Sequence, residues 1–132
     1  MKTFAGTIRF FVEGVPVPKA RPRVVRRPNG SAYAYTPKRT REWEELIAWV
    51  ARQKIEKPFE GPVRMELTFF LPRPKNGKSP FPVHRFDADN LGKSAIDALN
   101  GVAVVDDGQI VELIIRKRYG DPAGVKIEIE AL

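Results

Sequence analysis

The chain has no cysteine and a single histidine, His84, among its 132 residues. Without cysteine there can be no disulfide and no thiolate metal site, which fits a reducing cytoplasm. With one imidazole, the usual histidine and cysteine ligands of zinc are nearly excluded. Any metal ion bound here therefore has to be a hard cation that prefers oxygen ligands, such as Mg²⁺ or Mn²⁺.

Long apolar runs are also missing. No segment approaches the roughly 18 consecutive apolar residues of a membrane span, and residues 1–6 are too short and soon too polar for a signal peptide. We therefore expect a cytoplasmic protein with no membrane partner. With 42% hydrophobic residues over this length, a single domain over residues 1–132 with one core is expected.

Acidic residues are absent between Gly14 and Arg41, in a chain whose net charge is +7 and whose pI is about 9.9. A basic run this unbalanced repels itself and needs an anionic partner. Nucleic acid fits better than a membrane surface, because no apolar insertion face accompanies the charge. Tyr33 and Tyr35 lie within the run and either contact sugars or unstacked bases or pack inside a strand. The candidate contacts to nucleic acid are Lys19, Arg21, Arg23, Arg26, Arg27, Lys38 and Arg39.

The spacing of apolar residues predicts the elements of secondary structure. Alternation predicts strands over residues 8–13, 24–25, 32–35, 63–71, 110–119 and 124–131, with a tight turn at Asn29-Gly30. A first helix should open at Thr36-Pro37 with Thr36 as its N-cap and end near Pro58. Its expected inward residues are Trp43, Leu46, Ile47, Val50 and Ala51.

A second helix should begin near Asp89-Asn90 and stop at Asn100-Gly101. Its expected inward residues are Leu91, Ala95, Ala98 and Leu99. The order of these elements predicts an α+β fold, a single domain with a mixed β-sheet and two main helices packed on it.

Carboxylates are concentrated between Phe86 and Gly108. Asp87 and Asp89 have an ordinary explanation as residues that cap the second helix. If residues 87–89 are extended, both side chains point the same way and could hold a divalent cation. Asp106-Asp107-Gly108 could likewise form a turn or supply a metal ligand.

Lys93 lies four residues from both Asp89 and Asp97. On a helix this spacing gives two ion pairs of about 0.3–0.5 kcal/mol each. The alternative is a lysine beside a metal that contacts a scissile phosphate, with Asp97 orienting Lys93. Gly77-Lys78-Ser79 imitates the end of a phosphate-binding loop, but Pro72 stands where the first glycine is required, so we expect no nucleotide cofactor.

The residues also match a known pattern. The run Asp87-x-Asp89-Asn90-Leu91-x-Lys93, then Asp97-Ala98-Leu99-Asn100-Gly101, then Asp106-Asp107-x-Gln109-Ile110, resembles the RusA family of Holliday-junction resolvases, as do Pro16-x-Pro18-Lys19-x-Arg21-Pro22-Arg23 and Thr36-Pro37. The resemblance extends from about Gly14 to Arg118. It implies a small homodimeric endonuclease of DNA recombination and repair, often prophage-encoded. Such an enzyme needs Mg²⁺ or Mn²⁺ and nicks four-way DNA junctions symmetrically.

Carried over by position, the resemblance implies that Asp87, Asp89 and Asp107 are catalytic, metal-binding acids and that Lys93 is the catalytic lysine. Asp106 is a further candidate ligand, because the preceding segment is short here, but Asp107 is favoured. Two other functions stay open: a nuclease for branched or flap DNA in general, and a non-catalytic module that binds nucleic acid.

Overall fold

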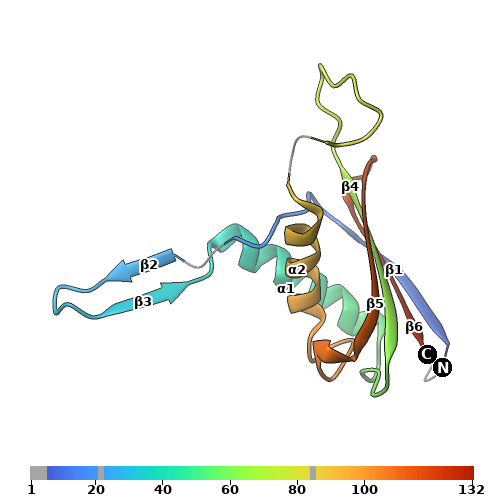
Figure 1. The fold of residues 1–132 in the computed structure, drawn as a ribbon, viewed down its shortest axis with the longest axis horizontal. Coiled ribbons are helices and arrows are strands. Elements are labelled where there is room, and N and C mark those ends of the chain that lie inside the picture. The colour runs from blue at the N-terminus through green and yellow to red at the C-terminus, as the bar shows by residue number, and fades with distance from the viewer. Residues whose placement is uncertain (1–5, 21–22, 84–85) are drawn as a thin grey trace.

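The computed structural model describes residues 6–20, 23–83 and 86–132, and its elements follow one another in the predicted order (Figure 1). The strands are β1 (Thr7–Glu13), β2 (Arg23–Arg26), β3 (Ala32–Tyr35), β4 (Val63–Leu71), β5 (Ile110–Tyr119) and β6 (Gly124–Ala131). The helices are α1 (Lys38–Lys54), α2 (Ala88–Leu99) and the short 3-10 helix η1 (Asp107–Gln109).

Four of the strands form one mixed sheet in the order β1-β6-β4-β5. β4 pairs antiparallel with β6 and parallel with β5, and β1 pairs antiparallel with β6. α1 and α2 lie on one side of this sheet (Figure 1). The predicted α+β fold is therefore confirmed, with β2 and β3 forming a separate ribbon.

The core lies between the helices and the sheet. The period of two along β4 is confirmed, because Val63, Met65, Leu67 and Phe69 are all fully buried. All four inward residues predicted for α2 are buried as well. These matches fix which face of each element meets the core.

Three features of helix packing differ from the sequence prediction or extend it. Leu46, expected to point inward on α1, is 37% exposed; it lies at the side of the apolar stripe, next to Gly14. Thr40 instead extends the stripe and donates its hydroxyl to the Pro18 carbonyl. On α2, a Cβ added to Gly92 would overlap Ile115, so this glycine lets α2 lie close against β5.

The predicted start of α1 is one residue early. Pro37 is the N-cap, with an extended ψ of 146°, and no side chain caps the helix, so Thr36 does not have the capping role. The start of α2 is one residue earlier than predicted, with Asp87 as its N-cap. No helix in the described part of the chain is long and apolar enough to cross a membrane.

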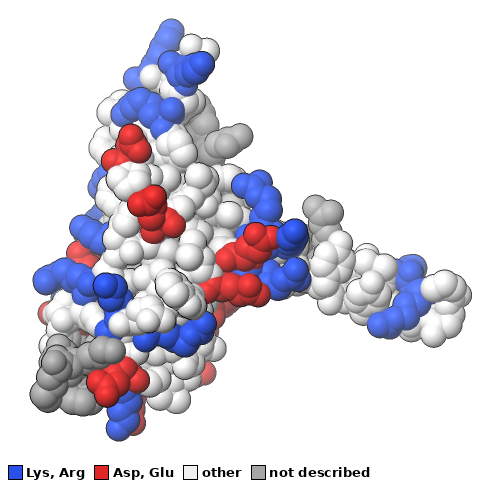
Figure 2. Space-filling model, turned by 180° about the vertical axis from the view of Figure 1, so that it is seen from behind, with Lys and Arg blue, Asp and Glu red and all other residues white. Residues whose placement is uncertain are grey.

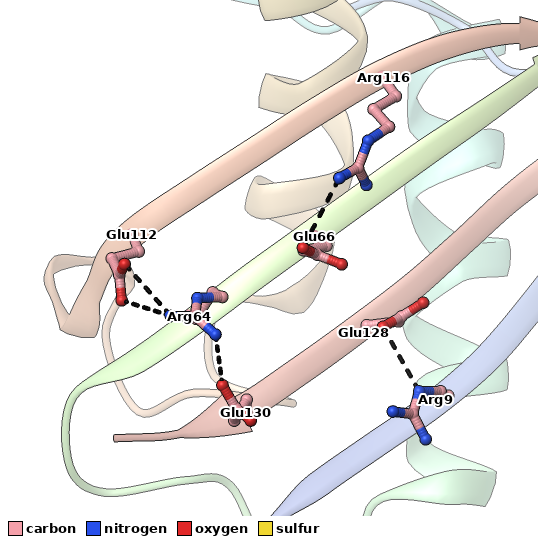
Figure 3. Close-up of polar contacts among 7 residues, drawn as sticks. All are labelled: Arg9, Arg64, Glu66, Glu112, Arg116, Glu128 and Glu130. Carbon is pink, nitrogen blue, oxygen red and sulfur yellow. Dashed lines mark hydrogen bonds and ion pairs between the residues drawn. The ribbon is translucent and has the colours of Figure 1, made fainter.

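The open face of the sheet carries a ladder of paired charges (Figure 3). Arg64 lies between Glu112 and Glu130, at 3.2 and 2.6 Å. The other pairs are Arg9–Glu128, Lys126–Glu128 and Arg116–Glu66. Since positive and negative side chains alternate here, this face offers little net attraction to a polyanion.

β2 and β3 form an arm that projects away from the body of the molecule (Figure 1). The tight turn predicted at Asn29-Gly30 is confirmed: Gly30 has a φ of 91°, and the Asn29 side chain accepts hydrogen bonds from the amide and hydroxyl of Ser31. Every residue of β3 is exposed. A two-stranded ribbon of this kind is marginally stable alone.

Candidate active site

Asp87 and Asp89 lie at the beginning of α2, and both are exposed. Asp87 has the N-cap position but its side chain makes no capping hydrogen bond, and Asp89 belongs to the first turn. The helix already begins at Ala88, so the condition under which both side chains would point the same way, an extended segment over residues 87–89, is not met. The two carboxylates nevertheless share one helix end, where the helix dipole favours negative charge.

Lys93 and Asp97 form an ion pair one turn further along α2. The Lys93 Nζ lies 3.6 Å from Asp97 Oδ1, and the Lys93 side chain is 63% exposed. The other oxygen of Asp97 lies 3.1 Å from the ammonium of Lys19. Asp97 therefore joins two lysines, and its contact with Lys93 is the ion pair expected for residues four apart on a helix.

Lys19 connects the two long helices. Its ammonium lies 2.8 Å from Glu44 on α1 and 3.1 Å from Asp97 on α2, and its side chain is only 20% exposed. Burial opposes the charge of Lys19, but the hydrogen bonds to Glu44 and Asp97, together with their negative charges, outweigh it and raise the pKa of Lys19. We expected Lys19 to contact nucleic acid, yet its charge is already neutralised inside the fold.

Asp106 and Asp107 have different surroundings although they are adjacent. The Asp106 carboxylate accepts a hydrogen bond from the Gly108 amide at 2.9 Å, and its own amide donates to the Gln109 side chain at 2.8 Å. These two bonds form a capping box for η1. Asp107 is exposed, and among the described residues its carboxylate has no partner.

Asp107 lies far from Asp87 within one chain. η1 leads directly into β5, whereas the Phe86 carbonyl beside Asp87 accepts a hydrogen bond from Lys117, near the other end of β5. The seven residue-to-residue steps from Ile110 to Lys117 span roughly 23 Å in a parallel strand. In agreement, no group of three acidic or histidine side chains in the described ranges is arranged to hold a metal ion.

The predicted contacts to nucleic acid are distributed over the arm and the start of α1. Arg26 and Arg27 are exposed on the arm, and the Arg27 guanidinium stacks on the Tyr33 ring at 4.5 Å. Lys38 and Arg39 are exposed in the first turn of α1. Arg21 lies outside the described residues, and for Arg23 only the backbone, in β2, is described.

A second basic region lies in the loop that follows β4, and it was missed by the sequence prediction. Figure 2 shows Lys and Arg side chains near the tip of the arm, at the right, and again at the top of the molecule, where the loop after β4 projects. Residues 72–86 contain no acidic residue, and Arg73, Lys75 and Lys78 are exposed. The absence of acids from this loop was the signal that could have identified it.

The exposed carboxylates of Asp87 and Asp89 lie on the same helix as Lys93, and basic side chains are exposed on the arm and on the loop after β4. The family model described as "Endodeoxyribonuclease RusA" matches residues 13–130. The chain is also similar to "Uncharacterized protein YqaN" of Bacillus subtilis (strain 168), with 33% identity over 135 residues that cover 92% of this chain and 94% of the relative. The chain belongs to the RusA family of endodeoxyribonucleases, whose members act on Holliday junctions.

Proposed function

We propose that this protein is a metal-dependent endodeoxyribonuclease that resolves four-way DNA junctions by paired, symmetric nicks. The observation that carries the proposal is the pair Asp87 and Asp89, exposed at the start of α2, with Asp89 one turn before Lys93. Helix capping, the ordinary explanation for Asp87, does not occupy its carboxylate. Both acids are therefore available for chemistry.

The donor atoms suit Mg²⁺, with Mn²⁺ as a possible substitute, because such ions prefer carboxylate oxygens. In the proposal Asp87, Asp89 and Asp107 hold the ion, while Asp106 maintains the turn that presents Asp107. A bound divalent ion supplies a Lewis acid that activates water and polarises the phosphate. Without the ion, the neighbouring carboxylates repel each other and the DNA.

Lys93 supplies the positive charge that the protein itself contributes. Its exposed ammonium lies on the same helix as Asp87 and Asp89, and Asp97 holds it at 3.6 Å. An ammonium beside the reacting phosphate would stabilise the charge that develops on the leaving oxygen. Lys19 is a positioning residue, because it holds Asp97 from the opposite side.

Two copies of the chain are needed to complete this site. One chain separates Asp107 from Asp87 by about the length of β5, so we propose that the partner's Asp107 joins Asp87 and Asp89 in a homodimer. β5 is an edge strand of the sheet, and its Val111 and Leu113 are 61% and 43% exposed.

A two-fold axis that pairs the β5 edges antiparallel would bring the start of one strand to the end of the other. The partner's Asp107 would then lie at the same end of the sheet as Asp87 and Asp89. The same symmetry supplies one active site for each of the two equivalent strands of a four-way junction. The arm and the loop after β4 would grip the phosphate backbone, independently of sequence.

The experiment is a cleavage assay on a synthetic four-way junction, with and without Mg²⁺, that maps the nicks on both strands. Asp89→Asn should abolish Mg²⁺-dependent cleavage while binding to the junction stays intact or becomes tighter, because a repelling charge is removed. Glu56→Gln, which changes an exposed carboxylate beyond α1, should cut normally. Cleavage by Asp89→Asn at the wild-type rate would show that the metal assignment is wrong.

The same assay separates the two other functions. Equal cleavage of flap and four-way substrates would indicate a nuclease for branched DNA in general. Cleavage of no substrate, together with no change of stability on adding Mg²⁺, would indicate a module that only binds nucleic acid.

A further inference from the structure

An apolar cavity lies at the end of the sheet where β4 and β5 finish. Its volume is about 470 Å³, and its lining includes Val15, Leu71, Arg73, Pro82, Phe86 and Tyr119. Sites for small organic groups typically measure about 300–1,000 Å³ and are mostly apolar. The cavity is therefore large enough for a planar ring system.

The walls of the cavity are held by specific contacts. The Arg73 guanidinium stacks on the Tyr119 ring at 4.3 Å, and its Nη1 donates to the Ser79 carbonyl at 3.1 Å. Phe86 has a φ of 57°, a left-handed conformation that is rare for an aromatic residue. Its carbonyl accepts a hydrogen bond from Lys117 at 2.9 Å. These contacts hold the Tyr119 ring and the backbone of Phe86 at the cavity.

The cavity adjoins the candidate active site. Phe86 directly precedes Asp87, so their Cα atoms are about 3.8 Å apart. The loop that forms one side of the cavity has no acidic residue and exposes Arg73, Lys75 and Lys78. The Arg118 guanidinium adds a further positive charge over the Phe81 ring, at 5.2 Å. An occupant with a flat apolar part and a negatively charged backbone fits these surroundings.

We propose that this cavity receives one unstacked nucleobase of the DNA strand that is cut, an inference that rests on the proposed function. The base would insert between Tyr119 and Phe86 while its phosphates contact the basic loop. Stacking on aromatic rings tolerates every base, so the apolar lining predicts weak sequence preference. A base at a branch point leaves its stack more easily than one inside a duplex. Capture of a base next to Asp87 therefore favours branched over linear DNA.

The test uses four-way junctions in which a single abasic site replaces each nucleotide around the nick in turn. At one position, removal of the base should slow single-turnover cleavage by roughly tenfold, the size expected for one stacked base. Tyr119→Ala should cause a similar loss on the intact junction and no further loss on that abasic junction. Val15→Trp, which fills the cavity from an exposed position, should give the same result if Tyr119→Ala fails to fold. Trp49→Ala, an exposed aromatic residue of α1, should keep the full sensitivity to the abasic site.

If Tyr119→Ala and the abasic site reduced the cleavage rate independently and additively, the inference would be overturned while the proposed function stayed intact. The same conclusion would follow if no abasic position slowed cleavage. If the wild-type protein cuts no junction, the proposed function fails, and the cavity is tested by binding instead. A junction with 2-aminopurine at the branch point should then change fluorescence with the wild-type protein but not with Val15→Trp. Equal changes with both proteins would contradict base capture.

Discussion

Asp106 and Asp107 are adjacent in the chain, but their carboxylates have different surroundings and therefore different roles. Asp106 is occupied by the capping box of η1, whereas Asp107 is exposed and has no partner among the described residues. Sequence alone left both roles open for both residues, since Asp-Gly turns and metal sites use the same side chain. The contacts of η1 explain Asp106 structurally and leave Asp107 as the candidate ligand.

Lys19 provides a prediction at the residue scale. Lys19→Met keeps most of the apolar stem but leaves Glu44 and Asp97 without their shared ammonium. We expect the free energy of unfolding to fall by about 1–3 kcal/mol, measured by chemical denaturation. Lys38→Met removes an ammonium that is 80% exposed and 3.7 Å from Glu42, so its effect should stay within about 0.5 kcal/mol.

The contribution of Lys19 should depend on pH in a defined direction. The folded state raises the pKa of Lys19 above its ordinary value of 10.5. Its stabilisation is therefore complete below that value and is lost as the pH rises through the higher folded pKa. The difference in stability between wild type and Lys19→Met should be constant near neutral pH and shrink above pH 10.5. A difference that grows in alkali would contradict this account.

At the scale of elements, period-two and helical patterns predicted β4, β6 and α2 almost to the residue. These patterns report which side chains face a core, and that local information is present in the sequence. The position of Lys19 between Glu44 and Asp97 could not be predicted, because it depends on how the segment after β1 crosses both helices. The distance from Asp107 to Asp87 was equally hidden, since it follows from the parallel pairing of β4 and β5.

The arm provides a prediction at the element scale. Arg27→Ala should weaken binding to a four-way junction and reduce the slope of log K against log salt by about one, as for the loss of one phosphate contact. Arg9→Ala is the matched control, because Arg9 is 68% exposed but paired with Glu128 on the open face of the sheet. Fluorescence anisotropy at several salt concentrations measures both slopes. Identical slopes for the two variants would show that Arg27 on the arm makes no phosphate contact and that the DNA binds elsewhere.

At the scale of the whole molecule, the account requires a dimer through β5. Leu113→Asp places a charge at an exposed apolar position of the edge strand β5 and should give a monomer in sedimentation that does not cut junctions. Leu132→Asp, at another exposed apolar residue, should remain a dimer and stay active. A dimeric and active Leu113→Asp protein would place the contact between subunits on another surface.

The most direct test of the central claim mixes two inactive variants, Asp89→Asn and Asp107→Asn, under conditions that let subunits exchange. If each site combines Asp87 and Asp89 of one chain with the partner's Asp107, every mixed dimer has one site without any substitution. The mixture should then nick one strand of a four-way junction in the presence of Mg²⁺, whereas neither variant does so alone. No nicking by confirmed mixed dimers would contradict a shared site and with it the proposed arrangement of the three acids.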